Sequence, residues 1–337
     1  MFEPFTTTGI GSLPHTNPTE ACGLALKTCD IPFWPQLPRL SFRESMVPQF
    51  SEGMPCIKID EHREIIWIEK DKGDDLARFY ETYSEDLKIA VSEDYARGFY
   101  AFIEMLEGRD FKYLKGQVTG PLTFTLGLKD SDGRPVYFDE ELREISLMVL
   151  KAKIFWQIRI LKRFAEHIII FIDEPILSAL GSTSYIGVNP DEALRLLRET
   201  SDAIKHAGGI PGIHCCGKAD WQMVINSKVE IINFDAYEYV ETISLYPDEF
   251  TAFLKNGGYL AWGIVPTTDS IKGENTDSIK RRFKNGFERL SKSLSPDLLL
   301  SKVLLTPSCG AGSRSIAETL KIFSILAELK NSLKGIH

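Results

Sequence analysis

The feature that most constrains the fold is an alternation of short apolar runs with long amphipathic stretches. Runs rich in Ile, Val or Leu predict β-strands at residues 5–10, 113–118, 167–172, 210–214, 230–234, 259–264 and 302–305, with a further candidate at 31–34. Helical patterns cover residues 18–28, 74–87, 93–106, 139–164, 190–206, 278–294 and 315–333. About eight strands alternating with helices over 337 residues predict an α/β fold, the TIM (β/α)8 barrel.

One segment departs from this alternation. Residues 55–70, PCIKIDEHREIIWIEK, have the pattern of a β-hairpin and predict an insertion of about residues 48–72 in an early βα connection. No linker rich in Pro, Gly or Ser divides the chain, so we expect residues 1–337 to form a single barrel domain.

Composition and charge argue against several classes of partner. The net charge of -8 and the lack of a basic run argue against nucleic acid. The longest apolar run, IIIFI at 168–172, is too short to cross a membrane, and the first residues do not resemble a signal peptide. We therefore expect a cytoplasmic protein, in which clustered cysteines indicate metal binding or catalysis more often than a disulfide.

Polar or soft side chains follow most of the predicted strands. In a TIM barrel the chemistry takes place at the carboxyl ends of the strands. The residues that occupy those positions here are Gly11, Ser12, Asp173, His214, Cys216, Asp235, Glu238 and Cys309. Such a recurrence predicts a functional site at this end of the barrel.

His214 and Cys216 are the strongest candidates for metal ligands. They stand two residues apart, so on an extended strand both point to one face and Cys215 points to the other. Imidazole and thiolate are preferred ligands of Zn²⁺. Cys309 and Glu238, at other strand ends, complete a predicted zinc site, while Asp235 could either support His214 or cap a turn.

This donor set indicates a particular kind of chemistry. Two thiolates, one carboxylate and a neutral imidazole leave Zn²⁺ with a net negative shell, which suits activation of a substrate thiol rather than hydrolysis. Carboxylate is the hardest of these ligands, so Glu238 is the one that an incoming thiol would displace. The predicted reaction is alkyl transfer to sulfur.

With these residues assembled, the chain resembles the catalytic C-terminal barrel of cobalamin-independent methionine synthase. The similarity is a series of ordered motifs: TTTGIGSLPHT at 6–16, VTGPLT at 118–123, IDEP at 172–175, the His-x-Cys of IHCC, Glu238, and TPSCG at 306–310. The resemblance implies that Ile10, Gly11 and Ser12 hold the carboxylate of homocysteine and that Asp173 pairs with its ammonium. It also implies His214, Cys216, Glu238 and Cys309 as the zinc ligands.

Two departures from that family concern the methyl donor. The chain has one barrel where the full-length synthases have two, and it lacks a Trp after the Thr-Gly-Pro turn and a His in the loop GIVPTT at 263–268. In the family these features serve the polyglutamyl folate donor. We therefore expect the donor to be a methylcorrinoid, either methylcobalamin or a corrinoid protein, which needs no proton donor for its leaving group.

Three alternatives stay open at this point. A methylcorrinoid:coenzyme M methyltransferase shares the His-x-Cys…Cys pattern, but its sulfonate substrate would not use Asp173. A uroporphyrinogen decarboxylase would need a cluster of arginines near the N-terminus, where only Arg39 and Arg43 occur. A non-catalytic zinc protein that binds a corrinoid partner is the third.

Overall fold

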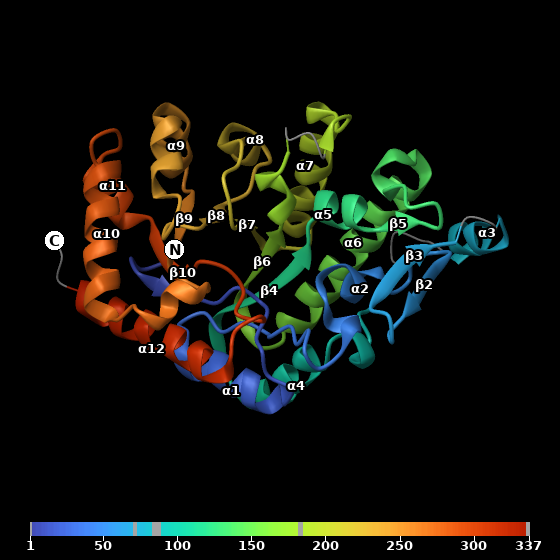
Figure 1. Cartoon of the computed structure of the whole chain (residues 1–337), viewed down its shortest axis with the longest axis horizontal. Helices are drawn as coiled ribbons and strands as arrows, with labels where there is room; N and C mark the ends of the chain where they lie inside the picture. The colour runs from blue at the N-terminus through green and yellow to red at the C-terminus, as the bar shows by residue number, and fades with distance from the viewer. Residues whose placement is uncertain (1, 70–72, 83–88, 181–184, 335–337) are drawn as a thin grey trace.

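A curled parallel sheet forms the centre of the molecule. The computed structural model describes residues 2–69, 73–82, 89–180 and 185–334. Its seven-stranded sheet has the order β1-β10-β9-β8-β7-β6-β4, and every neighbouring pair is parallel. The strands are β1 (Thr6–Thr7), β4 (Phe111–Thr119), β6 (Ala165–Asp173), β7 (Ile210–Cys215), β8 (Ile231–Phe234), β9 (Tyr259–Val265) and β10 (Val303–Pro307). The sheet is half of a barrel wall, wrapped by helices (Figure 1).

Helices cover the outer face of the sheet because the strands are buried on both sides. They are α1 (Pro18–Thr28), α2 (Met46–Ser51), α4 (Arg97–Leu106), α5 (Pro121–Gly127), α6 (Glu140–Leu161), α7 (Pro190–His206), α8 (Trp221–Asn226), α9 (Pro247–Lys255), α10 (Thr276–Leu290), α11 (Pro296–Ser301) and α12 (Ile316–Leu333). Several begin at a side-chain cap of the expected kind. Asn189 accepts hydrogen bonds from the first turn of α7, and Ser315 forms a capping box with Glu318 at α12. No helix in the described ranges has both the length and the apolar composition needed to span a bilayer.

The backbone of residues 31–36 lies between the two edge strands. On one side Ile31 N–H donates to Thr7 O at 3.0 Å and Gln36 N–H to Gly11 O at 3.1 Å. On the other side Lys115 N–H donates to Pro32 O at 2.8 Å. The strand predicted at 31–34 is present only as isolated bridges, because Pro32 and Pro35 have no N–H for a regular ladder.

Side chains of alternate strand residues fill the lumen. A separate buried cluster there contains Phe2, Ile10, Ile31, Tyr113, Ile169, Phe171, Ile231, Tyr259, Ala261 and Leu304. The intervening strand residues pack against the helices in the larger core. The floor of the lumen is aromatic, with Phe2 against Tyr113 and Tyr259 at centroid distances of 4.7 and 4.9 Å. Strand alternation therefore separates an inner, lumen-facing set of residues from an outer, structural set.

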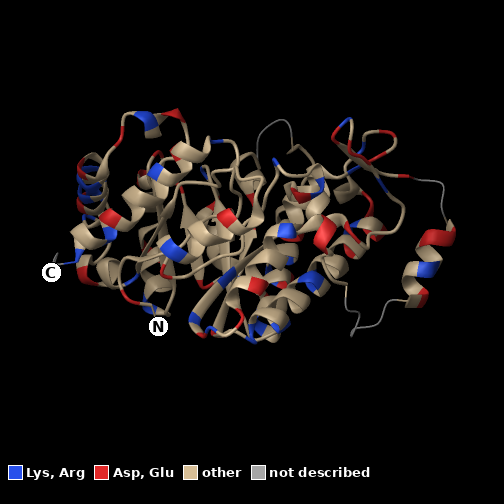
Figure 2. Cartoon of the chain, turned by 90° about the horizontal axis from the view of Figure 1, so that it is seen from below, with Lys and Arg blue, Asp and Glu red and all other residues tan. Residues whose placement is uncertain are grey.

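A second, smaller sheet extends from one end of the molecule. It pairs β2 (Ile57–Asp60) antiparallel with β3 (Ile65–Ile68), and β3 parallel with β5 (Lys129–Asp130). Helix α3 (Gly73–Thr82) lies beyond it in both views, and in the second view acidic and basic residues are interspersed over the outer helices (Figures 1 and 2). The antiparallel pair agrees with the predicted hairpin. Residues 70–72 of the predicted insertion lie outside the described residues.

The predicted helices differ from the observed ones mainly at their ends. The helix expected at 93–106 is a 3₁₀ turn, η2 (Glu93–Tyr95), followed by α4. The one expected at 74–87 is described from Gly73 to Thr82, and residues 83–88 lie outside the described part of the chain. The expected list lacked α2, α5, α8, α9 and α11, which have six to nine residues and are too short for a clear periodicity. The strand expected at 5–10 forms ladder pairs only at Thr6 and Thr7.

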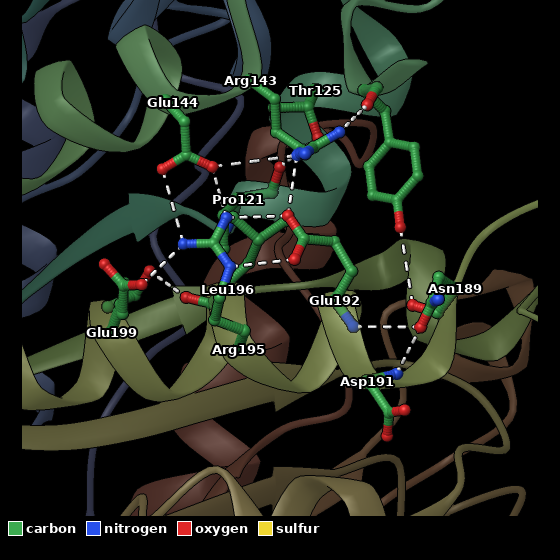
Figure 3. Close-up of polar contacts among 12 residues, drawn as sticks. Pro121, Thr125, Arg143, Glu144, Asn189, Asp191, Glu192, Arg195, Leu196 and Glu199 are labelled. Atoms are coloured by element: carbon green, nitrogen blue, oxygen red, sulfur yellow. Dashed lines mark hydrogen bonds and ion pairs between the residues drawn. The ribbon is translucent and has the colours of Figure 1, made fainter. Parts of the chain in front are cut away.

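A network of ion pairs joins α6 to α7 (Figure 3). Arg195 on α7 pairs with Glu144 on α6 and with Glu192 and Glu199 on its own helix, the latter two at 2.7 and 2.6 Å. Arg143 on α6 pairs with Glu192 at 2.7 Å. Half-buried networks hold their geometry better than isolated surface pairs.

We expect the Arg195→Met variant to lose about 1–2 kcal/mol of unfolding free energy, because three carboxylates lose the cation that they share. Urea denaturation would measure the loss. Arg163→Met is the matched control: Arg163 and Glu107 are each 60% exposed, so its loss should stay below about 0.5 kcal/mol. Equal losses would mean that the network contributes no more to the free energy of unfolding than a single surface pair does.

Candidate metal centre

Three potential metal ligands meet at the carboxyl ends of the strands. The Nε2 or Nδ1 atom of His214, at the end of β7, and the sulfurs of Cys216 and Cys309 all lie within 4.8 Å of one another. His214 is buried, whereas both cysteines are partly accessible. The structure therefore brings together three of the four zinc ligands expected from the sequence.

Asn233 on β8 holds His214 in the orientation that a metal ligand needs. The Asn233 amide nitrogen donates to Ala261 O at 2.8 Å and to Thr306 Oγ1 at 2.7 Å, which uses both of its hydrogens. Its Oδ1 therefore accepts from Nδ1 of His214, so Nδ1 carries the proton. The buried Nε2 has no hydrogen-bond partner. An imidazole fixed in this tautomer presents its Nε2 lone pair to a cation.

Cys216 differs sharply from the other cysteines. The neighbouring Cys309 thiol, and then the His214 ring, lower the pKa of Cys216, while the same proximity keeps the proton on Cys309 and raises its pKa. Burial raises the pKa of Cys215 to about 12, as it does for Cys22 and Cys29. A thiol of low pKa beside an imidazole and a second thiol is typical of a metal site, whereas the isolated buried thiols are unreactive.

Glu238 does not join this group. Its side chain is exposed, and its backbone N–H donates to Asp235 Oδ1 at 2.9 Å. Asp235, the residue directly after β8, is only 7% exposed and lines a cavity together with Cys216 and Cys309. Burial raises the pKa of the Asp235 carboxyl to about 6. The carboxylate at the end of β8 is therefore Asp235, three residues earlier than the one selected from the sequence.

A cavity of about 310 Å³ opens beside the three ligands. It is lined by Ile10, Ser12, Gln36, Pro38, Glu44, Ser45, Met46, Asp173, Pro175, His214, Cys216, Cys309 and Gly310. Its described lining contains no Lys or Arg. Asp173 is 5% exposed, its Oδ1 has no hydrogen-bond partner, and burial raises its pKa. An unpartnered carboxylate in a cavity wall is available to a cationic group of a ligand.

The turn at Gly11 shapes the same cavity. Gly11 has φ of +29°, and a Cβ there would lie 2.4 Å from Gln36 Oε1, so a side chain is excluded by both conformation and space. The turn is held by Leu13 N–H donating to Gln36 O at 2.9 Å and by Ala311 N–H donating to Ser12 O at 2.8 Å. Ile10 and Ser12, predicted as substrate contacts, both line the cavity.

A second, wider cavity of about 620 Å³ shares Cys216, Cys309 and Gly310 with the first. Its other lining residues are Asp235, Thr267, Thr268, Asp269, Ser270, Ser308, Ser313 and Arg314. Hydroxyl groups dominate this wall, and its described lining includes no aromatic side chain. The two thiols therefore stand where two spaces of different character meet.

Sequence reasoning missed two polar residues at this end of the barrel. Asn233 is the one polar side chain in the buried strand β8, and a single polar residue in a buried strand indicates a functional or hydrogen-bonding role. Glu44 is 1% exposed, and its carboxylate accepts from the backbone N–H groups of Leu37 and Arg97 at 3.1 and 3.2 Å. It lies in a short 3₁₀ turn with no strand periodicity, so no sequence pattern indicated it.

Glu174, in contrast, points away from the cavity, as its position next to Asp173 at the end of an extended strand implies, and its carboxylate accepts from the backbone N–H groups of Leu122 and Thr123.

Comparison with known proteins gives structural matches only. No protein-family model and no curated protein sequence matches the chain. A B12-independent methionine synthase from Shewanella sp. W3-18-1, in complex with selenomethionine, has a similar structure, with a TM-score of 0.61, 15% identity and 100% coverage of both chains. A methyltransferase from Methanosarcina mazei has a TM-score of 0.54 and 17% identity over 97% of this chain and 93% of the other. At these identities the likeness shows a shared fold.

We expect Asn233→Leu to weaken zinc binding about 10- to 100-fold, because the imidazole would lose the acceptor that fixes its tautomer. Competition with a chromogenic chelator would measure the affinity. Cys215→Ser is the control, since Cys215 faces away from the group and should keep the wild-type affinity. An unchanged affinity in Asn233→Leu would show that the hydrogen bond does not orient a ligand.

Proposed function

We propose that the protein is a zinc-dependent S-methyltransferase that methylates a small thiol, with homocysteine as the acceptor and methionine as the product. The observation that carries the proposal is the buried Nε2 of His214, without a hydrogen-bond partner and next to two thiols. The similarity in fold to a B12-independent methionine synthase and to a methyltransferase supports the same reading.

The residues present fit zinc better than a hard cation. One imidazole and two thiols are soft or borderline donors, which Mg²⁺ and Ca²⁺ avoid. His214, Cys216 and Cys309 would hold the ion. When bound there, zinc would lower the pKa of an acceptor thiol so that it reacts as a thiolate near neutral pH.

For the fourth ligand we propose a carboxylate of the segment after β8. Asp235 is the better candidate, because it is buried and shares a cavity with both thiols. Glu238, expected from the sequence, is exposed in this structure and would have to turn inward.

The smaller cavity suits an amino acid that carries a thiol. Asp173 would pair with the ammonium, while the backbone at Ile10, Gly11 and Ser12 would receive the carboxylate. A sulfonate such as that of coenzyme M would meet the acidic Asp173 and Glu44 instead of a cation. This charge pattern supports homocysteine over coenzyme M as the acceptor.

The wider cavity supports a large donor that approaches from the other side of the thiols. We propose a methylcorrinoid, free or on a corrinoid protein. With such a donor the acceptor sulfur would form the new S–CH₃ bond as the Co–CH₃ bond breaks, and the bonding electron pair would stay on cobalt, taking Co(III) to Co(I). No proton donor would then be needed at the leaving group, and the described lining has no histidine to serve as one.

The architecture that we propose around this site is a closed, single-domain barrel. Residues 31–36 would take the place of an eighth strand, since their backbone forms hydrogen bonds to residues on both edges of the sheet. The segment at about 48–72 would be an insertion beside the acceptor cavity. A reducing compartment such as the cytoplasm would keep the site cysteines as thiols.

We expect purified wild-type protein to bind about one zinc per chain, and Cys309→Ala to lose most of it, because a zinc site loses much of its affinity when one thiolate ligand is removed. Metal analysis after dialysis would measure both. No zinc in the wild type, even after addition, would contradict the proposal.

Among the carboxylates, Asp235→Ala should lower zinc affinity more than Glu238→Ala. The reverse order would restore Glu238 as the ligand.

We expect zinc-loaded protein to transfer methyl from methylcobalamin to homocysteine faster than from methyltetrahydrofolate, because the described donor cavity lacks an aromatic platform and a histidine acid. Mass spectrometry of methionine would follow both reactions. The control is Asp173→Asn, which should impair homocysteine far more than a thiol without an ammonium. Zinc binding without any methyl transfer would instead favour the non-catalytic corrinoid-partner reading.

A further inference from the structure

Lys115 is a cation enclosed in the lumen beneath the candidate site. It lies on β4 and is fully buried. Its ammonium lies 4.5 Å from the ring centroid of Phe171 and 5.8 Å from that of Phe33, and it donates to Gln117 Oε1 at a long 3.5 Å. No ion pair joins it to a carboxylate in the described ranges. Sequence reasoning gave it no role.

Burial of such a group is costly, so its presence needs a reason. A lysine in an apolar interior loses its hydration, and a packed apolar residue of the same length usually gives a more stable protein. Phe33 and Phe171 offset part of this cost. The next layer toward the site holds Gln117, whose amide donates to Trp34 O at 3.2 Å, beside Phe171, and the layer after it holds Asp173 beside Thr119. Among the neighbouring acidic groups, Asp173 does most to raise the pKa of Lys115.

The site above Lys115 accumulates negative charge. With a divalent cation bound, the negative groups of the site would be two thiolates and the carboxylates of Asp235 and Asp173. Their four negative charges exceed the two positive charges of the cation by two. A zwitterionic aminothiol that binds as a thiolate adds one more negative charge. In a low-dielectric lumen this charge needs a counter-charge close by.

We infer that Lys115 is a positioning residue whose fixed positive charge, under Asp173 in the lumen, allows the acceptor to bind as a thiolate. The inference rests on the proposed function and extends it. Lys115 does not line either cavity, so it acts through the field at Asp173 and the thiols rather than by contact.

The protonation of Lys115 makes the expected affinity for the acceptor depend on pH. Burial lowers its pKa to about 8, against the opposing influence of Asp173 on β6 and of Cys29 after α1. Cys29 is a neutral thiol, and the remaining groups packed on Lys115 are Gln117, Phe33 and Phe171. The counter-charge is therefore present below about pH 8 and is lost above it.

Lys153 provides a matched control. It is equally buried, and it donates to Ala90 O at 3.2 Å from α6, outside both cavities. Burial lowers its pKa to about 7. In both lysines the folded-state pKa lies below the unfolded value of 10.5, so the unfolded chain binds more protons and stability rises with pH between these values. Replacement by Met should remove this penalty in both.

The test compares Lys115→Met, Lys153→Met and wild type, all loaded with zinc, by calorimetric titration with L-homocysteine in two buffers. We expect Lys115→Met to keep or raise the melting temperature but to bind homocysteine about tenfold more weakly. It should also lack the fall in affinity that begins near pH 8 in the wild type. Lys153→Met should keep or raise the melting temperature with wild-type binding and pH dependence.

The outcomes separate the inference from the proposed function. Equal homocysteine affinity and pH dependence in Lys115→Met and wild type would overturn the role of Lys115. A loss of stability with unchanged binding would also overturn it, in favour of a structural role. Absence of homocysteine binding to zinc-loaded wild type would overturn the proposed function, and this role with it.

Discussion

The parallel register of the strands is the constraint on which the candidate site depends. Asp173 pairs with Thr119 on one side and with His214 on the other, and His214 pairs with Asn233. Residues in register share a face, so one layer of the lumen holds hydroxyl, carboxylate, imidazole and amide side by side. A slip of one residue in any strand would turn its member of the layer out into the apolar core.

The lumen changes character along its axis. The floor is closed by Phe2, Tyr113 and Tyr259, the next layer holds Lys115 beside Ile169, and Gln117 and Phe171 follow. The layer above it is polar, and the two partly accessible thiols come last. This order places the charged groups of the site above an apolar floor, where the low dielectric strengthens the interaction between their charges.

Much of this arrangement could be predicted from sequence, because strand alternation and strand ends leave clear patterns. His214, Cys216 and Cys309 were identified from the position of reactive side chains after apolar runs, and the structure brings them together. Glu238 was selected because it follows the predicted strand next to that of His214, but the sequence pattern cannot tell which carboxylate after a strand is buried, and in the structure it is Asp235. Lys115 was missed because lysine in a sequence reads as a surface residue, and only the fold shows it enclosed.

The short stretch between the two edge strands links the wall of the barrel to the acceptor cavity. It carries two prolines, which have no N–H to donate, so it bonds to the edges at separate points and not through a regular ladder. Gln36 donates its backbone N–H to Gly11 O and also lines the acceptor cavity. One residue therefore both ties an edge of the sheet and shapes the binding space, so a substitution that moves its backbone would change the form of that space.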